Sequence, residues 1–523
     1  MNAQANQLAF YLRESGAGPE TVVALLMDRG IDFLICMLAV FKAGGAYLPM
    51  DPKHPVQRQM QLLEQSRTTH VIGSVDKVRE LEALTQAQSE ALRPVFFHIE
   101  ERRKLATQDS DPVSTTTAAN AAYVIYTSGS TGIPKGAMIE QLGMLNHLCA
   151  KVKDLGLQAS DVIAQTASQC FDISVWQFLA PLVTGARTSI FPDSVVADPK
   201  ELFDNVIAQQ VTILEIVPSL LRAALEEIES ARMPVPRFST LRWLLLTGEA
   251  LPPELVRRWL QHYPDIPIMN AYGPTECSDD VAHYAIRAKN SLDSVHTPIG
   301  TPIVNTQLYI LDQQMAPVPV GIPGELYVGG TGVGRGYLHD ALRTAQVFVP
   351  NVFSLRAGAR LYRTGDLVRR LPGGEIVYLH RTDHQIKMRG FRIELGEIEA
   401  ALERHPDVLQ AAVVMHEDEN QSKRLVAYVA TRDELTDSAL RDALQQQLPD
   451  YMVPSVFVTL RVLPLTANGK LDRKALPAPP RAEHVVIAPR NLIEAKIAEI
   501  WEQVLAISSV GVNEDFFQIG GHS

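Results

Sequence analysis

Short apolar runs, each bounded by glycine, proline or polar residues, recur along roughly the first 380 positions of the chain. Such runs are typical of strands buried on both faces of a parallel sheet. We expect strands in YVIYT (123–127), RTSIF (187–191), VTILEIV (211–217), LRWLLLTG (241–248) and ELYVGG (325–330). Segments with helical periodicity separate these runs, so the pattern predicts an α/β fold, a large core with mainly parallel sheets.

A smaller unit is predicted from about Asp383 onward. Helical periodicity is present in 393–408 (IELGEIEAALERHPDV) and 439–448 (ALRDALQQQL). Strands are expected in 411–417 (AAVVMHE) and 424–430 (RLVAYVA). We therefore predict an N-terminal core over 1–382 and a small, mobile α+β C-terminal subdomain over 383–475.

A proline-rich tract, LPAPPRAEHVV, predicts a linker over 476–487. The remaining segment, 488–523, contains one convincing amphipathic helix at 491–505 (NLIEAKIAEIWEQVL). One helix buries too little apolar surface for an independent core. The segment is therefore expected to be a partial helical domain.

Composition and charge narrow the function classes. The chain has 523 residues and a formal net charge of -11, with no basic run, so nucleic acid is not expected as a partner. The most apolar window, 22–48, is interrupted by four charged residues, which excludes a membrane span there. No basic head followed by an apolar run marks a signal peptide at the N-terminus. A cytoplasmic location is expected.

Cysteine and histidine patterns offer no metal motif. The four cysteines are scattered, without a Cys-x-x-Cys pair, and are expected to be structural thiols in a reducing compartment. His380 and His384 are four residues apart, but no third ligand is near in sequence. A zinc site is therefore not expected.

A glycine-rich tract, YTSGSTGIPKG (126–136), follows the predicted strand YVIY. Its glycines allow backbone N–H groups to converge on an anion, and Lys135 adds positive charge. Because Lys135 stands three residues after Gly132, with Ile-Pro between them, the spacing differs from a P-loop. A flexible turn is the alternative, but the tract favours phosphate binding.

Three acidic residues occupy positions where their carboxylates need a cation or solvent as a partner. Glu215 interrupts the apolar run 211–217, and a buried carboxylate without a partner is costly. Asp279 and Asp280 are adjacent at the end of NAYGPTECSDD (270–280), so they repel one another unless solvent or a cation is near. The alternative for Glu215 is that it snorkels or pairs with an arginine.

Several motifs occur in a fixed order and resemble those of one family. They are YTSGSTGIPKGAMIE, FDISVW, NAYGPTE, GELYVGGTGVGRGYL, YRTGDL, RTDHQIKMRGFRIELGEIE, LPDYMVP and NGKLDRKAL. Together they resemble the amino-acid adenylation domain of nonribosomal peptide synthetases, within the adenylate-forming superfamily. The terminal DFFQIGGHS resembles the start of a peptidyl carrier domain. The chain departs from the family at His380, where glycine is usual, and begins part-way through the family's first motif.

The resemblance implies that an amino-acid carboxylate attacks the α-phosphorus of ATP, giving aminoacyl-AMP and pyrophosphate. Cations and directed donors must then supply most of the catalysis. The residues implied for ATP are Thr127, Ser128, Gly129, Ser130, Thr131, Gly132 and Lys135 for phosphate, Thr275 beside them, Asp366 and Arg381 for ribose, and Tyr272 and Asn270 for adenine. Glu276 is implied as the ligand of Mg²⁺, which prefers such oxygen donors.

The small subdomain is implied to supply the catalytic residue. Lys470 would bridge the substrate carboxylate, the α-phosphate and the ribose only when that subdomain closes, with Asp383 as the hinge. Ser523 would carry the 4'-phosphopantetheine thiol that receives the amino acid. The implied partners are therefore a carrier domain, neighbouring synthetase modules and a small MbtH-like helper protein, with no membrane.

The resemblance also implies an amino-acid pocket. Its positions are Asp172, Ile173, Trp176, Glu215, Leu245, Thr247, Ala271, Asp279, Asp280 and Lys470, with Asp172 holding the α-ammonium. The three further carboxylates favour a cationic side chain, and the bulk of Trp176 favours a short one. We expect 2,4-diaminobutyrate as the substrate and ornithine next. The set also resembles pockets assigned to 2,4-diaminobutyrate.

Two other functions are compatible with the motifs. One is an acyl- or aryl-CoA ligase of the same superfamily, although its substrate would leave Asp172 without an ammonium partner. The other is a catalytically silent scaffold domain, against which the presence of Lys470, Glu276 and Asp366 argues.

Overall fold

The computed structural model describes residues 1–85, 93–104, 110–129, 132–288, 295–383, 385–417, 423–433, 435–464, 471–473, 475–479, 489–505 and 510–512. The chain divides into two compact units. The larger unit comprises Met1–Thr127, Pro134–Asp383 and Lys387–Arg392. The smaller unit comprises Ser128–Ile133, His384–Ile386 and Ile393–Ser523. After the long segment Pro134–Asp383, the chain therefore leaves the larger unit directly after Asp383.

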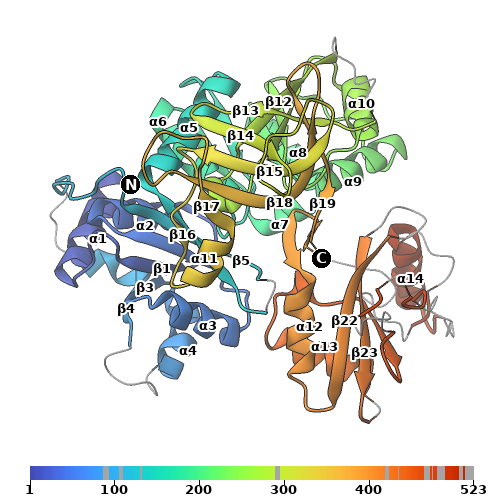
Figure 1. Cartoon of the computed structure of the whole chain (residues 1–523). Helices are drawn as coiled ribbons and strands as arrows, with labels where there is room; N and C mark the ends of the chain where they lie inside the picture. Colours follow the sequence, from blue (N-terminus) through green and yellow to red (C-terminus); the bar gives the residue numbers. More distant parts are fainter. Residues whose placement is uncertain are drawn as a thin grey trace. The chain divides into compact units, whose positions relative to one another are not determined.

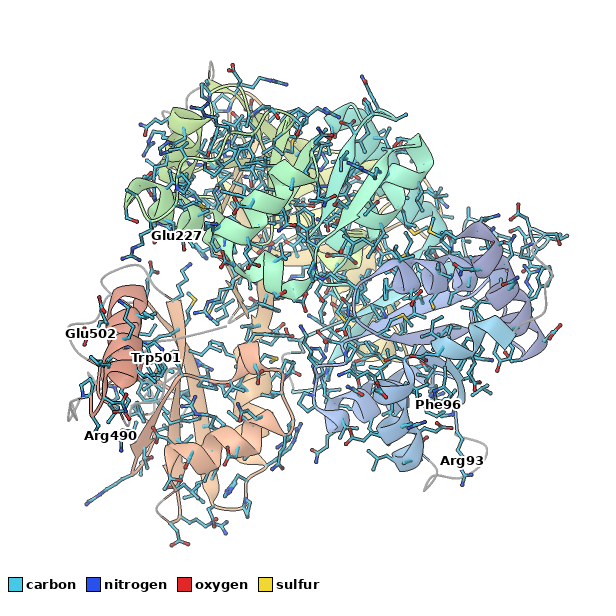
Figure 2. All side chains as sticks on the ribbon, turned by 180° about the vertical axis from the view of Figure 1, so that it is seen from behind. Arg93, Phe96, Glu227, Arg490, Trp501 and Glu502 are labelled. Atoms are coloured by element: carbon cyan, nitrogen blue, oxygen red, sulfur yellow. The ribbon has the colours of Figure 1, made fainter. Side chains whose placement is uncertain are left out.

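The first sheet of the larger unit has the strand order β16-β6-β5-β2-β1-β3-β4 (Figure 1). Its strands are β1 (Val22–Leu26), β2 (Ala46–Met50), β3 (His70–Gly73), β4 (Val95–His98), β5 (Ala121–Thr127), β6 (Lys135–Glu140) and β16 (Gly336–Tyr337). β1 to β5 run parallel, whereas β6 and β16 are antiparallel additions. β4 forms one edge, where Phe96 is labelled in Figure 2. The helices in this part are α1 (Asn2–Glu14), α2 (Ile31–Ala43), α3 (Val56–Ser66) and α4 (Val75–Thr85).

The second sheet has antiparallel strands at one end and parallel strands at the other. Its strand order is β14-β15-β18-β19-β13-β12-β11-β10-β9-β7-β8, with β17 beside β18. The parallel strands are β7 (Val162–Gln165), β8 (Arg187–Ile190), β9 (Ile213–Ile216), β10 (Trp243–Leu246) and β11 (Ile268–Tyr272). The antiparallel strands are β12 (Ala282–Ile286), β13 (Pro298–Pro302), β14 (Thr306–Leu311), β15 (Pro323–Gly330), β17 (Phe348–Pro350), β18 (Arg360–Arg370) and β19 (Ile376–Arg381).

Helices alternate with the parallel strands of this sheet. They are α5 (Gln141–Leu155), α6 (Ile173–Thr184), α7 (Asp193–Ala197), α8 (Pro199–Ala208), α9 (Pro218–Glu229), α10 (Pro253–His262) and, further on, α11 (Ala341–Val347). Proline begins α8, α9 and α10, where the first helical residue needs no N–H donor. All residues of β9 and β10 are buried, which explains their nearly continuous apolar sequences.

The smaller unit has a three-stranded sheet, β22 (Val408–Glu417), β23 (Lys423–Thr431) and β24 (Val456–Leu460), with α12 (Leu395–Glu403) and α13 (Asp437–Gln445). α12 packs beside β22 (Figure 1). β20 (Gln385–Met388) and β21 (Phe391–Glu394) pair with each other. The last described helix, α14 (Leu492–Leu505), follows Arg490, which is labelled in Figure 2. The Arg490 guanidinium pairs with Glu494 at 2.8 Å.

The predicted α/β class is confirmed, and the expected strands and helices coincide with observed elements within a few residues, except that the helix expected over 393–408 is limited to α12 (Leu395–Glu403), between β21 and β22. Among the described helices, none combines the length and the apolar character needed to cross a bilayer. The predicted boundaries at 382, 475 and 487 stay predictions.

Candidate active site

The parallel strands of the second sheet bring several predicted pocket residues together at their carboxyl ends. Glu215 on β9 lies opposite Leu245 on β10 in the strand register. Thr247 directly follows β10, and Ala271 lies near the end of β11. In α/β proteins ligands bind at this edge of a parallel sheet. The structure therefore places these four residues where a substrate pocket is expected.

The loop after β11 turns Asp279 and Asp280 inward. A Cβ on Gly273 would meet the Asp279 carbonyl oxygen at 1.8 Å, so glycine permits the close return of the chain. Ser278 and Asp279 adopt left-handed backbone conformations with φ of 65° and 75°. Asp279 and Asp280 are consequently only 4% and 1% exposed. Neither carboxylate is left to solvent.

Helix α6 presents Asp172, Ile173 and Trp176 from its first turns. The Asp172 carboxylate caps the helix and accepts a hydrogen bond from the Ile173 amide at 3.0 Å. Burial raises the pKa of Asp172, while a hydrogen bond from Thr275 opposes that shift. The Trp176 indole N–H donates to Glu215 Oε2 at 2.7 Å, which links α6 to β9.

A buried lysine that the sequence reasoning missed lies among these acids. Lys151 on α5 is 0% exposed. Its Nζ lies 2.5 Å from Asp280 Oδ2 and 3.6 Å from Glu215 Oε1. The same ammonium lies 4.7 Å from the centroid of the Trp176 ring, within the range of a cation–π interaction.

Two histidines complete the cluster. His147, one turn before Lys151 on α5, has its Nε2 3.5 Å from Asp279 Oδ2 and 3.6 Å from Asp280 Oδ2. His283 on β12 contacts Asp280 Oδ2 through Nε2 at 3.1 Å and Asp154 Oδ2 through Nδ1 at 2.8 Å. Asp280 therefore meets three nitrogen-bearing side chains.

The surroundings of Asp279 and Asp280 shift their pKa values in opposite directions. Burial alone would raise the pKa of Asp280, but Lys151, His147 and His283 together hold it well below its usual range. Burial and the neighbouring Asp280 raise the pKa of Asp279 well above its usual range. Of the two adjacent aspartates, Asp280 therefore has the lowered pKa and pairs with Lys151, and Asp279 has the raised pKa.

The pKa values of the two bases on α5 are also shifted in opposite directions. Burial lowers the pKa of His147 to about 4, so this imidazole is neutral at pH 7. Burial would also lower the pKa of Lys151, but Asp280 and Glu215 more than reverse that effect. Lys151 is therefore a permanent internal cation. The pKa of Glu215 is raised by burial, with Lys151 opposing the shift.

These contacts correct one step of the sequence reasoning. A substrate cation is not required to neutralise all three carboxylates, because Glu215 and Asp280 already face Lys151. The sequence did contain a signal. In α5, Met144, His147, Leu148 and Lys151 recur at a spacing of three or four residues and all are buried, so a lysine and a histidine occupy the core face.

The predicted metal ligand, Glu276, lies in the short 3-10 helix Thr275–Cys277 and is 0% exposed. Its Oε2 accepts a hydrogen bond from Arg392 at 2.7 Å, and its Oε1 accepts one from the Tyr337 hydroxyl at 2.7 Å. Lys135 Nζ lies 3.8 Å away. Burial would raise the pKa of Glu276, but Arg392 and Lys135 hold it well below its usual range. Glu276 is therefore ionised.

The predicted ribose and adenine residues also lie together. Arg381 donates to Asp366 Oδ1 at 2.8 Å, and the Tyr272 hydroxyl donates to Asp366 Oδ2. Lys387 Nζ lies 5.6 Å from the Tyr272 ring centroid. The Asn270 amide donates to the Pro298 carbonyl oxygen at 2.7 Å, which fixes its side chain beside β13.

The glycine tract is described in part. Thr127 ends β5, and the Gly129 amide donates to a carboxylate oxygen of Glu397 at 3.0 Å. Gly132 has a φ of 77° and donates to the Gly129 carbonyl oxygen. The described amide of this tract is thus bonded to a side chain of the protein itself, and the predicted phosphate binding stays a prediction. Four predicted site residues lie outside the described residues: Ser130, Thr131, Lys470 and Ser523.

Comparisons with known families match both parts of the chain. Residues 1–338 match the model of the family described as AMP-binding enzyme. Residues 397–470 match the model described as AMP-binding enzyme C-terminal domain. The chain is 39% identical to part of tyrocidine synthase 3 from Brevibacillus parabrevis and 38% identical to part of gramicidin S synthase 2 from Brevibacillus brevis. Each match covers 100% of this chain but only 8% and 12% of the relative.

Solved structures give the same result. A four-domain nonribosomal peptide synthetase, holo-AB3403 bound to AMP and glycine, matches 100% of this chain and 37% of its own with a TM-score of 0.60 and 32% identity. Holo-PA1221, which contains adenylation and PCP domains and binds a vinylsulfonamide inhibitor, matches 99% of this chain and 84% of its own with a TM-score of 0.79 and 26% identity. The predicted resemblance to adenylation domains, and the class of amino-acid adenylating ligase, are confirmed.

Proposed function

We propose that this chain, which belongs to the AMP-binding enzyme family, activates a short basic amino acid as aminoacyl-AMP and transfers it to a carrier phosphopantetheine thiol in nonribosomal peptide synthesis. 2,4-Diaminobutyrate is the favoured substrate and ornithine the next. The chain spans about a tenth of the length of the curated relatives it matches. Its carrier domain, neighbouring modules and MbtH-like helper are therefore part of the proposal.

The buried carboxylate of Asp172 carries the assignment to an amino acid. The groups that set its pKa, besides burial, are Thr275, the Ile173 amide and two other carboxylates, and none of them is a cation. An α-ammonium would supply the missing charge, because a buried carboxylate is costly without a partner. An acyl or aryl acid has no such ammonium, which disfavours the CoA ligase alternative.

Asp279 supports the assignment to a basic side chain. Its Oδ2 is buried and has no hydrogen-bond partner among the described residues, and its nearest base, His147, is neutral at pH 7. A substrate ammonium beside Asp279 would favour the ionised form of this carboxyl group and pair with it. The indole of Trp176 is buried beside Glu215, and its bulk favours a short substrate side chain.

The charged groups of the nucleotide site support ATP chemistry. Lys135 supplies positive charge for phosphate, and Asp366, oriented by Arg381, can accept hydrogen bonds from ribose hydroxyls. The ionised carboxylate of Glu276 fits Mg²⁺, a hard cation that binds oxygen ligands, and the Thr275 hydroxyl is adjacent in sequence. When bound, Mg²⁺ neutralises phosphate charge. The AMP-bound relative supports the same nucleotide assignment.

In the reaction, one carboxylate oxygen of the amino acid forms a bond to the α-phosphorus, and the bond to the bridging oxygen of pyrophosphate breaks. We assign the bridging of these groups in the transition state to Lys470, and the hinge of the small subdomain to Asp383. A thiolate then displaces AMP from the adenylate to form the thioester. Preorganised cations lower the barrier because charge develops on oxygen.

Pyrophosphate exchange into ATP tests the proposal. We expect exchange that depends on an amino acid and is absent with aryl or acyl acids. Exchange driven by an aryl acid would favour the CoA ligase, and no exchange with any acid would favour the silent scaffold.

A further inference from the structure

Helix α5 contributes no position to the amino-acid pocket carried over from the family, yet it places Lys151 inside the acidic cluster. The Lys151 side chain is 0% exposed and the Asp280 side chain is 1% exposed. Lys151 contacts three of the expected pocket residues: Asp280, Glu215 and the face of Trp176. A buried lysine with such contacts can replace a charge that a substrate would otherwise supply.

We propose that Lys151 determines the length of the accepted side chain: its ammonium is a built-in counter-ion for Glu215 and Asp280, and it leaves Asp279 to bind the substrate ammonium. The inference rests on the proposed function and names the residue that separates short from long basic substrates. Lys151 acts through the two carboxylates and is a positioning residue, not a catalytic one.

The hydrogen bonds of Glu215 and Asp280 fit this role. Glu215 Oε2 accepts from the Trp176 indole and from the Gln177 amide at 3.3 Å, which directs Oε1 toward Lys151. Asp280 Oδ2 faces Lys151 and His283. Both carboxylates are thus engaged by the protein itself.

A longer substrate would compete with Lys151. The ammonium of a lysine side chain that extended past Asp279 would approach Lys151 Nζ, and two like charges in one buried cluster repel. A 2,4-diaminobutyrate side chain is two methylenes shorter than that of lysine, so its ammonium would stay farther from Lys151. The internal cation thereby excludes long cationic side chains by charge as well as by volume.

The same ammonium argues against a metal ion in this cluster. One nitrogen of His147 and one oxygen each of Asp279 and Asp280 lie within 4.8 Å of one another, a spacing that could hold a metal. Lys151 Nζ already lies 2.5 Å from Asp280, and a second cation there would be repelled.

Substitution of Lys151 tests the inference. The Lys151→Ala variant removes the internal cation and opens space, so lysine can place its own ammonium between Glu215 and Asp280. We expect the ratio of kcat/KM for lysine to that for 2,4-diaminobutyrate to rise about 10²-fold over wild type in pyrophosphate exchange, because unpaired buried groups discriminate strongly. Lys153→Ala, at an exposed position of the same helix, should leave the ratio unchanged. A folded Lys151→Ala enzyme with unchanged KM for ATP and the wild-type ratio would overturn the inference.

A second variant keeps the test decisive if Lys151→Ala does not fold. In Lys151→Met/Asp280→Asn both buried charges are removed together, and the volume at position 151 is largely retained. This enzyme should still prefer 2,4-diaminobutyrate over 2-aminobutyrate by at least about tenfold, because Asp279 still binds the ammonium. Loss of that preference would show that the substrate ammonium is bound by Asp280, and would refute the inference.

Failure of the proposed function gives a different result. If wild-type enzyme prefers a neutral amino acid, the short-basic assignment is wrong. The role of Lys151 is then tested by the ratio of kcat/KM for lysine to kcat/KM for that neutral substrate. This ratio should still rise in Lys151→Ala. An unchanged ratio there would overturn the inference separately.

Discussion

Lys151 Nζ lies 2.5 Å from Asp280 Oδ2 in the interior of the larger unit, where the two side chains are 0% and 1% exposed. One of the two adjacent aspartates is therefore held by the protein itself. Both aspartates have one buried oxygen without a hydrogen-bond partner among the described residues, Asp279 Oδ2 and Asp280 Oδ1, but Asp279 Oδ2 faces the imidazole of His147 at 3.5 Å rather than an ammonium. This difference between neighbouring carboxylates is the basis for the specificity that we assign to the site.

Breaking the Lys151–Asp280 pair should destabilise the fold. Asp280→Asn or Lys151→Met alone leaves an uncompensated buried charge, which costs about 3 kcal/mol of unfolding free energy. The double variant should lose less than the sum of the two, with a coupling of about 1–3 kcal/mol. Urea unfolding of wild type, the two single variants and the double variant measures this coupling free energy. Additive losses would show that the pair is not coupled.

The secondary structure and fold class were largely predictable from the sequence, but the candidate site was only partly so. Apolar runs such as 211–217 and 241–248 identified β9 and β10 because strands buried on both faces have few polar positions. Glu215 was recognised for the same reason. Lys151 was missed because its partners are 64 and 129 residues away along the chain, and local periodicity indicates burial but not which side chains meet.

His147 should make stability depend on pH. Its pKa is lowered to about 4, chiefly by burial and also by Lys151 and His283, while Asp280 opposes the shift. Between its ordinary pKa and pH 4 the unfolded chain binds more protons than the folded one, so stability falls as pH falls. This histidine should account for about 2 kcal/mol of the loss between pH 7 and pH 5.

Urea unfolding at both pH values, in wild type and His147→Gln, checks this. Subtracting the two proteins removes the contributions of Asp279, Asp280 and His283 that they share. A difference that is independent of pH would contradict the assigned pKa of His147.

Lys470→Ala should reduce pyrophosphate exchange by orders of magnitude while ATP still binds, because we assign its contacts to the transition state. Lys423→Ala, at an exposed position of the same subdomain, is the matched control. Exchange and ATP affinity are measured in parallel. Near-normal exchange in the Lys470 variant would remove the catalytic role from this residue.

Glu276→Gln should lower exchange by about 10²-fold or more, because it removes the negative charge to which we assign Mg²⁺ binding and which faces Lys135. Tyr337→Phe removes one hydrogen bond to the same carboxylate but keeps its charge, so it should cost about 1 kcal/mol of stability and little activity. The Mg²⁺ dependence of exchange distinguishes the two variants. Equal activities in both would argue against a role for the Glu276 charge.

Competition between 2,4-diaminobutyrate and 2-aminobutyrate in pyrophosphate exchange tests the central claim most directly, because the two side chains differ by one ammonium. Wild-type enzyme should prefer 2,4-diaminobutyrate by about 10²-fold or more in kcat/KM. Asp279→Asn should remove most of that preference while exchange with 2-aminobutyrate survives. A wild-type enzyme that activates 2-aminobutyrate or an acidic amino acid better would contradict the account.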